Sequence, residues 1–283
     1  MYDNSHDKKI LQCLTCSLII SLPFILQKIK KNPFTSYCDN IMATVVTTIK
    51  SAKEVLASLW KEPFCIEHDE KLVNHRVVQV SKAGTLPLKV MAAFLCEQYY
   101  VVSADIRSME HLVSRCEDSD VIGQYFSFFY NGQKLAHRKL LTMAKAMGLS
   151  ELDLENYEPQ ASAQGYPSYF CYLAHYGEIP QIVAAIAVNF PTFGQMCSSH
   201  EDSMKKKYDM KHEDLDFLRF FGVCDLDEGA VKVIEAFKAN DKGKMSEIEY
   251  KSIRRAVRLL QAYEVMFLDS IYESSVFKSK DSN

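Results

Sequence analysis

The sequence predicts an all-α protein, because three of its features agree. From residue 43 onward, apolar residues recur at intervals of three and four residues, which is the period of a helix with one buried face. Glycine and proline, which interrupt helices, are sparse, with 10 Gly and 8 Pro in 283 residues. No segment alternates between apolar and polar residues as a half-buried strand does. A helical bundle around one large core is therefore expected.

Helices are expected along most of the chain, separated by short turns. Gly84 can end one helix, and Thr85 with Pro87 can begin the next. No internal repeat and no long linker interrupts the sequence, so residues 42–283 are predicted to form one domain. The expected helical ranges are 44–61, 67–82, 87–113, 119–147, 160–176, 179–200, 212–222, 226–239 and 246–275.

Residues 1–41 have a different character. Residues 10–26 form a mostly apolar run that is followed by lysines, at the short limit of what can span a bilayer. Acidic rather than basic residues precede the run, so it does not match a signal peptide. Residues 1–41 are therefore predicted to be a poorly ordered or apolar extension. Membrane contact is unexpected except through residues 10–26.

Charge and cysteine usage narrow the class of protein. The formal net charge is −3, the pI is near 6.3, and basic residues alternate with acidic ones, so nucleic-acid binding is not expected. The nine cysteines are scattered through apolar stretches, which predicts reduced thiols in a cytoplasmic protein. Cys13 and Cys16 have no second pair at metal-binding spacing, and no phosphate-binding loop or HExxH motif occurs. No metal and no cofactor are expected.

Glu264 interrupts the apolar stripe of the last predicted helix. Burying a carboxylate costs several kcal/mol unless it is protonated, paired or hydrogen-bonded. We interpret Glu264 as a functional residue; the alternative is that it lies at the edge of the stripe and pairs with Arg254 or Arg258. The stripe consists of Ile253, Val257, Leu260, Phe267 and Ile271.

Glu97 and Tyr100 form a second polar feature, on the predicted helix 87–113. They lie three residues apart on one face, near Ala93 and Ala104. A carboxylate and a phenol beside small side chains can hold an amine or amidine group of a ligand. A surface glutamate beside a half-buried tyrosine is the alternative.

Other polar and aromatic residues are less specific. His137 lies in an apolar helix, where a hydrogen-bonded core histidine is the common outcome, and Asn189 is a buried amide that needs partners. Tyr166 and Tyr169 belong to an aromatic series that can either stack on a flat ligand or fill the core.

Several segments, taken in order, resemble the TenA family of the haem-oxygenase-like superfamily. That family typically has an HPF motif, then GTLP, then a carboxylate and tyrosines. The resemblance implies a haem-oxygenase-like helical bundle around a central pocket, and a homo-oligomer. The matching segments are 74–87, which contains Gly-Thr-Leu-Pro, 93–100, 134–138, 166–169, 183–186 and 263–267.

TenA proteins of the thiaminase II type hydrolyse aminopyrimidines derived from thiamin, with a cysteine nucleophile and a proton-transferring glutamate. The resemblance places the glutamate at Glu264 but the cysteine at Asn189. An amide cannot attack as a thiolate does, so Cys171 or Cys96 would have to replace it. The resemblance and the patterns together predict Glu264 and Cys171 as catalytic residues, and Glu97, Tyr100, Tyr166, Tyr169, Asn189, His137 and Phe221 as substrate-binding residues.

Three other functions on the same fold stay open. One is a non-catalytic protein that binds a small molecule or a partner. Another is a cofactorless oxidase like PqqC, which needs a pocket rich in His, Arg and Lys. The third is a di-iron oxygenase, although only two of its six ligand positions match here. Those positions fall on Tyr130, His137, Phe190, Phe221, Asp225 and Glu228.

Overall fold

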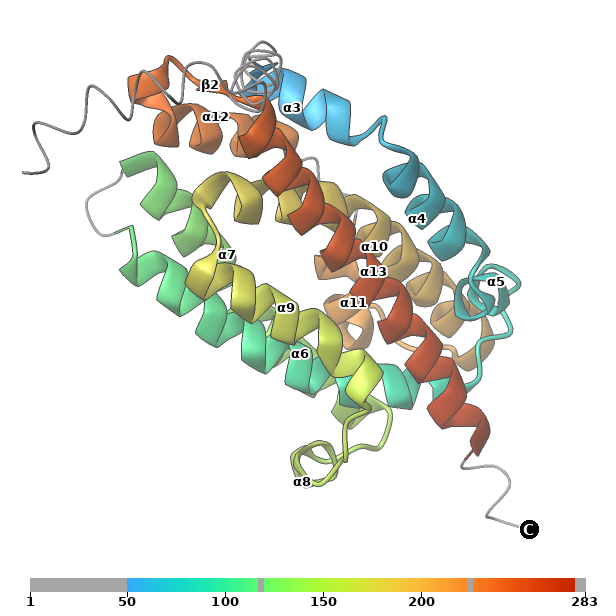
Figure 1. The fold of residues 1–283 in the computed structure, drawn as a ribbon. Helices are drawn as coiled ribbons and strands as arrows, with labels where there is room; N and C mark the ends of the chain where they lie inside the picture. The colour runs from blue at the N-terminus through green and yellow to red at the C-terminus, as the bar shows by residue number, and fades with distance from the viewer. Residues whose placement is uncertain (1–49, 117–119, 223–225, 278–283) are drawn as a thin grey trace, which may run out of the picture. The chain divides into compact units, whose positions relative to one another are not determined.

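The computed structural model describes residues 50–116, 120–222 and 226–277, and most of these residues are helical (Figure 1). The prediction of an all-α fold is confirmed. The residues from Lys50 onward form one compact unit. The predicted extension, residues 1–41, lies outside the described residues. No helix among the described residues is long and apolar enough to span a membrane.

The elements follow one another with short connections. They are β1 (Lys50–Ser51), α3 (Ala52–Leu59), α4 (Pro63–Asn74), α5 (Arg76–Lys82), α6 (Leu88–Ser114), α7 (Asp120–Ala146), α8 (Glu151–Glu155), α9 (Ala161–Tyr176), α10 (Ile179–Tyr208), η1 (Glu213–Leu215), α11 (Asp216–Phe220), α12 (Asp227–Phe237), η2 (Ala239–Asp241), β2 (Lys244–Met245) and α13 (Glu247–Phe277). The strands β1 and β2 pair in antiparallel fashion over two residues each.

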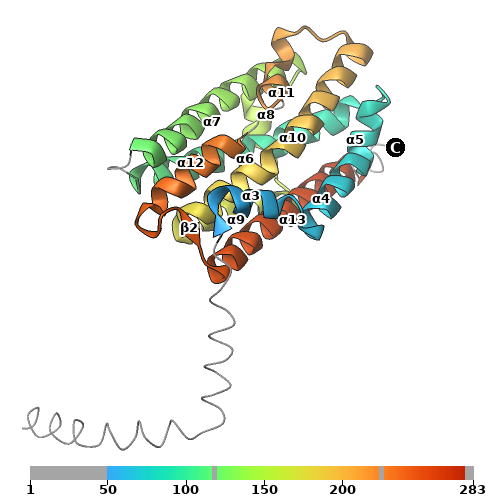
Figure 2. The same ribbon diagram turned by 90° about the horizontal axis from the view of Figure 1, so that it is seen from above.

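The helices α10 and α13 form the centre of the bundle. Residues 182–188 of α10 are buried on every side, as expected for a helical segment that is apolar all round. The helix α13 packs against both α9 and α10, and α6 packs against α7 and α9 (Figures 1 and 2). The predicted stripe on α13 is buried along its length, as its spacing required.

The core has two halves that meet near the middle of these helices. One half gathers residues of α3, α12 and the first turns of α10 and α13. The other gathers residues of α5, α6, α11 and the last turns of α13. Tyr166 and Phe190 pack against both halves. Side chains at this junction face the interior from several helices.

The structure departs from the sequence expectations mainly at helix ends. The expected helix 67–82 is divided at His75, whose backbone is extended and whose Nδ1 accepts a hydrogen bond from the Val77 amide at 3.3 Å. Apolar residues continue at helical spacing through this break, so periodicity alone does not reveal it. The expected helix 179–200 continues to Tyr208 and ends at Asp209, which has a left-handed backbone with φ of 50°. The short helix α8 was not predicted.

A close approach of α10 to the end of α11 depends on Gly194. A Cβ atom at this position would lie 2.4 Å from the carbonyl oxygen of Phe221. We therefore expect Gly194→Ala to lower the free energy of unfolding by about 1–3 kcal/mol, the usual cost of overpacking. As a control, Gly132→Ala on α7 places its Cβ 3.6 Å from the Phe220 ring. That variant should be neutral or gain up to about 1 kcal/mol of helix propensity. Chemical denaturation measures both variants, and equal stability of the two would contradict the close approach.

Candidate functional site

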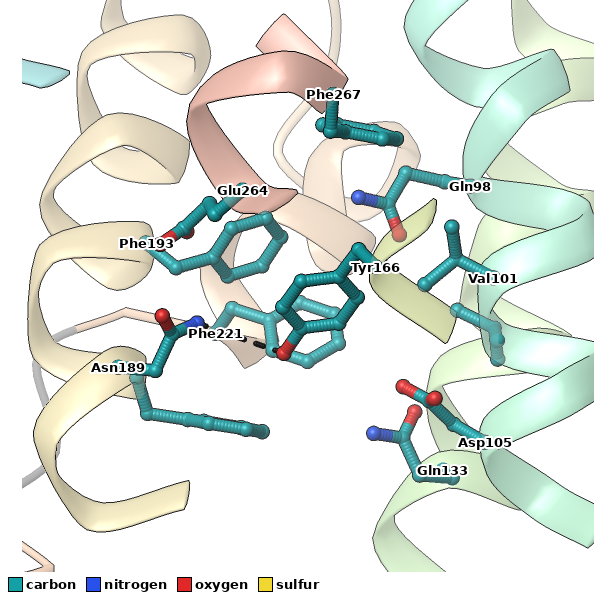
Figure 3. A pocket seen from close by; sticks show the side chains of 12 residues that line it. Gln98, Val101, Asp105, Gln133, Tyr166, Asn189, Phe193, Phe221, Glu264 and Phe267 are labelled. Carbon is teal, nitrogen blue, oxygen red and sulfur yellow. Dashed lines mark hydrogen bonds between the residues drawn. The ribbon is translucent and has the colours of Figure 1, made fainter. Parts of the chain in front are cut away.

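A cavity lies where α6, α7, α9, α10 and α13 meet (Figure 3). Aromatic rings form much of its wall, and two carboxyl groups and three amides also line it. No lysine, arginine or histidine among the described residues lines it. Its volume is about 40 Å³, which suits a few water molecules. The lining residues are Gln98, Val101, Val102, Asp105, Gln133, Tyr166, Asn189, Phe190, Phe193, Phe221, Glu264 and Phe267.

Glu264 brings a half-satisfied carboxylate to this cavity from α13. Its side chain is buried, and its Oε2 accepts a hydrogen bond from Nε2 of His68 at 2.9 Å. Its Oε1 is also buried and finds no hydrogen-bond partner in the described part of the chain. The alternative was a pair with Arg254 or Arg258. Instead Oε2 pairs with His68, Oε1 has no partner among the described residues, and Arg254 pairs with Glu62 at 2.8 Å. Glu264 is thus fixed through one oxygen, while the other remains available to a ligand.

His68, on α4, was missed by the sequence analysis. Burial alone would lower its pKa, but the hydrogen bonds to Asp69 and Glu264, and the charges of both carboxylates, raise it to about 9. His68 is therefore a buried imidazolium at neutral pH. Its spacing from Cys65 and Leu72, three and four residues away, places it on the buried face of α4. That spacing is the signal that could have identified it.

Asn189 and Tyr166, two predicted site residues, meet in the cavity. Nδ2 of Asn189 donates to the Tyr166 hydroxyl at 3.4 Å, and Oδ1 of Asn189 is buried with no partner among the described residues. Burial raises the pKa of Tyr166 well above its ordinary value, so the phenol stays protonated. Phe221, also a predicted site residue, lines the same cavity. The structure thus brings Glu264, Asn189, Tyr166 and Phe221 together.

Asp105 on α6 and Gln133 on α7 are cavity residues that the sequence analysis missed. Their side chains are 7% and 5% exposed. Oδ1 of Asp105 and Oε1 of Gln133 have no hydrogen-bond partner within the described ranges. Burial raises the pKa of Asp105 to about 8. Asp105 follows Val101 and Val102 on a buried helix face, so the criterion that singled out Glu264 would also have identified Asp105.

Comparison with known proteins identifies the family of this chain. The model of the TENA/THI-4/PQQC family matches residues 66–274. This chain belongs to that family. No curated protein sequence matches it.

Solved structures agree with this assignment. A TenA homolog from Pseudomonas syringae pv. tomato has a TM-score of 0.63 at 14% identity, over 77% of this chain and 92% of its own. A TenA homologue from Pyrococcus furiosus has a TM-score of 0.62 at 16% identity, over 77% and 100%. A Shewanella denitrificans domain with a haem-oxygenase-like fold has a TM-score of 0.60 at 14% identity, over 80% and 95%. At these identities the likeness shows the fold, and the predicted family and haem-oxygenase-like fold are confirmed.

Glu97 was expected to bind a ligand in the central pocket, but in this member of the TENA/THI-4/PQQC family it lies outside the cavity. The carboxylate is fully buried but faces away from the cavity, toward the segment before α9. It accepts hydrogen bonds from the Tyr157 hydroxyl and the Gln160 amide at 2.8 Å each, and from Nε2 of Gln164 at 3.1 Å. The next residue, Gln98, lines the cavity instead, because successive helical residues point about 100° apart. Glu97 is saturated by the protein's own donors.

Three further predicted binding residues also lie outside the cavity. The Tyr100 hydroxyl lies 2.9 Å from the carbonyl oxygens of both Glu155 and Tyr157, and it anchors the α8 region to α6. Tyr169 stacks on a neighbouring tyrosine ring with centroids 5.9 Å apart. His137 is half-buried beside an aromatic ring, and burial lowers its pKa. These residues pack and anchor helices.

The structure places Cys171, the expected replacement nucleophile, outside the cavity. It is half-buried on α9, with its Sγ 3.6 Å from Nδ1 of His175, and it does not line the cavity. Cys96 is buried on α6 and does not line the cavity either. Burial raises the pKa of Cys65 to about 12 and that of Cys197 well above its ordinary value. No cysteine in the described ranges lines the cavity.

The oxidase alternatives find little support in the side chains present. Within the described ranges, no three His, Cys, Asp or Glu residues group closely enough to hold a metal ion. Phe190 and Phe221, at two of the di-iron ligand positions, offer no donor atoms. The Tyr130 hydroxyl donates to Glu110 at 3.3 Å. Asp225 lies outside the described residues. A PqqC-like pocket would need cationic side chains, and the described lining has none.

The surroundings of Glu97 predict a structural role. We expect Glu97→Ala to lower the free energy of unfolding by about 3–5 kcal/mol, because it leaves buried donors without an acceptor. Glu110→Ala, at an exposed position of the same helix, should change it by less than about 1 kcal/mol. Urea denaturation measures both variants. A Glu97→Ala protein as stable as the wild type would contradict this assignment.

The buried pair of His68 and Glu264 predicts a pH-dependent stability. The pKa of His68 rises from about 6.5 in the unfolded chain to about 9 in the folded one, so the folded state binds more protons between these values. The resulting stabilisation is complete below about pH 6.5 and disappears as the pH rises through 9. The stability difference between wild type and His68→Gln should therefore shrink across this window. His212→Gln, at an exposed position, is the control, and a constant difference from pH 6 to 9.5 would rule out the effect.

Proposed function

We propose that this protein hydrolyses a small amino-substituted pyrimidine, with Glu264 as the proton-transferring group and water as the attacking group. The observation that supports this most directly is the state of the Glu264 carboxylate. The residue lines the cavity, one of its oxygens accepts from His68 at 2.9 Å, and the other is buried without a hydrogen-bond partner among the described residues. A carboxylate held in this way can accept a proton from a bound water molecule.

The chemistry of the cavity wall supports an amino-substituted ring. The unpartnered oxygens of Asn189 and Glu264 are hydrogen-bond acceptors, so they suit a ligand that offers N–H donors. The rings of Tyr166, Phe193 and Phe221 suit the faces of a flat heterocycle. The unpaired acceptors of the cavity thus favour a ligand with hydrogen-bond donors, and its aromatic side chains favour a planar ligand.

The proposed step is a hydrolysis that balances without a cofactor. The water oxygen forms a bond to the carbon that carries the leaving amine, and the bond from that carbon to nitrogen breaks. Glu264 takes the proton from water and passes it to the departing nitrogen, so the products are an alcohol and ammonia. His68 donates to Oε2 throughout, so Oε1 is the oxygen left to exchange the proton.

The cavity must adapt to admit a ring. A dry cavity of roughly 150 Å³ is known to bind benzene, whereas this cavity measures about 40 Å³. At least one aromatic side chain of the wall therefore rotates when a pyrimidine binds. The homo-oligomer and the cytoplasmic location expected from the sequence belong to the same proposal.

Binding without turnover is a second candidate. The observation that favours it is the lack of a thiol among the described cavity residues, together with Asn189 at the position where the family resemblance places the cysteine. Such a protein would bind the ligand in the cavity without converting it to a product. Both candidates predict that the ligand binds, but only hydrolysis predicts the release of ammonia.

An ammonia-release assay with an aminomethyl-substituted aminopyrimidine tests the proposal. Wild-type protein should release ammonia, and Glu264→Gln should reduce the rate by at least about 100-fold, because the proton-transferring group is lost. Glu273→Gln, at an exposed position of the same helix, is the matched control and should retain the rate. Calorimetry on the same proteins reports binding separately.

Each outcome of this assay has a distinct meaning. Binding without ammonia release by wild type would establish the second candidate, and the absence of both would overturn the aminopyrimidine proposal. Cys171→Ser and Cys96→Ser should retain activity, because neither thiol lines the cavity. Loss of turnover in either variant would overturn the direct attack by water.

A further inference from the structure

The cavity has a second polar end, distinct from the one that contains Glu264. Asp105 comes from α6 and Gln133 from α7, and Figure 3 shows them near each other, across the Tyr166 ring from Asn189 and Glu264. The proposed hydrolysis makes no use of Asp105 or Gln133. Their place in the cavity therefore needs its own explanation.

Both residues present buried oxygens without partners. Oδ1 of Asp105 and Oε1 of Gln133 make no hydrogen bond with any described residue. A buried polar atom left unpaired costs about 1–3 kcal/mol, so such atoms are rare unless a water or a ligand satisfies them. These two side chains are more than nine-tenths buried and line one cavity. Together they form a place for a group that donates hydrogen bonds.

The charges around Asp105 favour a positively charged group there. From α9 it faces the Tyr166 phenol, which stays neutral, and from α13 it faces Glu264 across the cavity. Gln133 and Asn189, from α7 and α10, are uncharged. No cationic side chain among the described lining residues compensates a charge on Asp105. A cation supplied by a ligand would be the missing partner.

We propose that Asp105 and Gln133 form a subsite for an ammonium or amidinium group of the ligand. The inference rests on the proposed use of the cavity as a ligand site, but not on hydrolysis. The ligand class is a planar aromatic ring with a positively charged nitrogen group at the end opposite Glu264. The Asp105 carboxylate pairs with the charge, and the Gln133 oxygen accepts one N–H.

Binding at this subsite is coupled to a proton. Burial raises the pKa of Asp105 to about 8, so the empty site is mainly the neutral acid at pH 7. A cation binds to the ionised form, and the carboxyl proton leaves to solvent. Affinity for a permanently charged ligand therefore rises with pH until about pH 8. Between pH 6 and pH 8 the ionised fraction increases about 50-fold, and the affinity should follow it.

Calorimetry with benzamidine, a planar amidinium, tests the subsite, with benzamide as the uncharged probe of similar shape. Titrations in two buffers of different ionisation enthalpy count the protons released. We expect about one proton released per benzamidine at pH 6 and about 50-fold tighter binding at pH 8. Asp105→Asn should abolish the proton release and the pH dependence, whereas Glu264→Gln should retain both. Benzamide should show neither.

The alternative outcomes overturn the proposal in distinguishable ways. Loss of benzamidine binding in Glu264→Gln but not in Asp105→Asn would place the cation at the other end of the cavity. No benzamidine binding at any pH would exclude a cation subsite, while the ammonia assay would still report on hydrolysis. Gln133→Glu should tighten benzamidine binding severalfold, and weaker binding to that folded variant would exclude Gln133 from the subsite.

The stability of Asp105→Asn shows independently that the variant folds and that Asp105 is a buried acid. The folded pKa lies near 8 and the unfolded one near 4, so the folded wild type binds more protons between these values. The stability of wild type relative to Asp105→Asn must then fall as the pH rises from about 4 to 8. An identical pH dependence of the two proteins would contradict the buried acid on which the coupling depends.

Discussion

Three carboxyl groups, those of Glu97, Asp105 and Glu264, are removed from water in the middle of this helical bundle, and the rest of the site follows from how each is compensated. Glu97 accepts three hydrogen bonds from the protein. Glu264 has one oxygen compensated by the His68 imidazolium and one left over. No cationic side chain among the described lining residues compensates Asp105, and burial raises the pKa of this acid to about 8. The two residues with an uncompensated oxygen, Glu264 and Asp105, both line the cavity. A ligand bound there can supply the missing hydrogen bonds or charge.

The fold and the burial of Glu264 could be predicted from the sequence because both depend on helical periodicity. The stripe on α13 is buried as its three- and four-residue steps require, and the carboxylate within it is buried too. His75 shows the limit of this signal, since apolar residues on either side of it keep the helical spacing although its backbone is extended. The break depends on a local cap that periodicity does not encode. His68 and Asp105 carry the same signal as Glu264, which is a polar residue on a buried helix face. Both could therefore be identified from the sequence by the same criterion.

Of the residues that the sequence resemblance predicted for the site, the structure places some in the cavity and others outside it. Glu264, Asn189, Tyr166 and Phe221 occupy the cavity. Glu97 does not, because a change of one residue on a helix turns a side chain by about 100°, and it is Gln98 that faces inward. A short motif match cannot resolve one position on α6, whereas the hydrogen bonds to the segment before α9 fix it in the folded chain. The direction of a side chain is thus a tertiary property, even where the element itself is predictable.

The way in which the cavity opens is constrained by the same packing. Phe221 lines the cavity, and its carbonyl oxygen lies where α10 approaches closely at Gly194. Its ring lies 5.2 Å from that of Phe193 and 5.3 Å from those of Phe217 and Phe220, measured between centroids. A backbone shift at this point would separate α10 from the end of α11, so the cheaper response to a ligand is rotation of an aromatic side chain. Rings packed edge to face restrict one another's rotation in a close-packed interior. Admission of a ring-shaped ligand should therefore involve several of these side chains together, at the boundary where the two halves of the core meet.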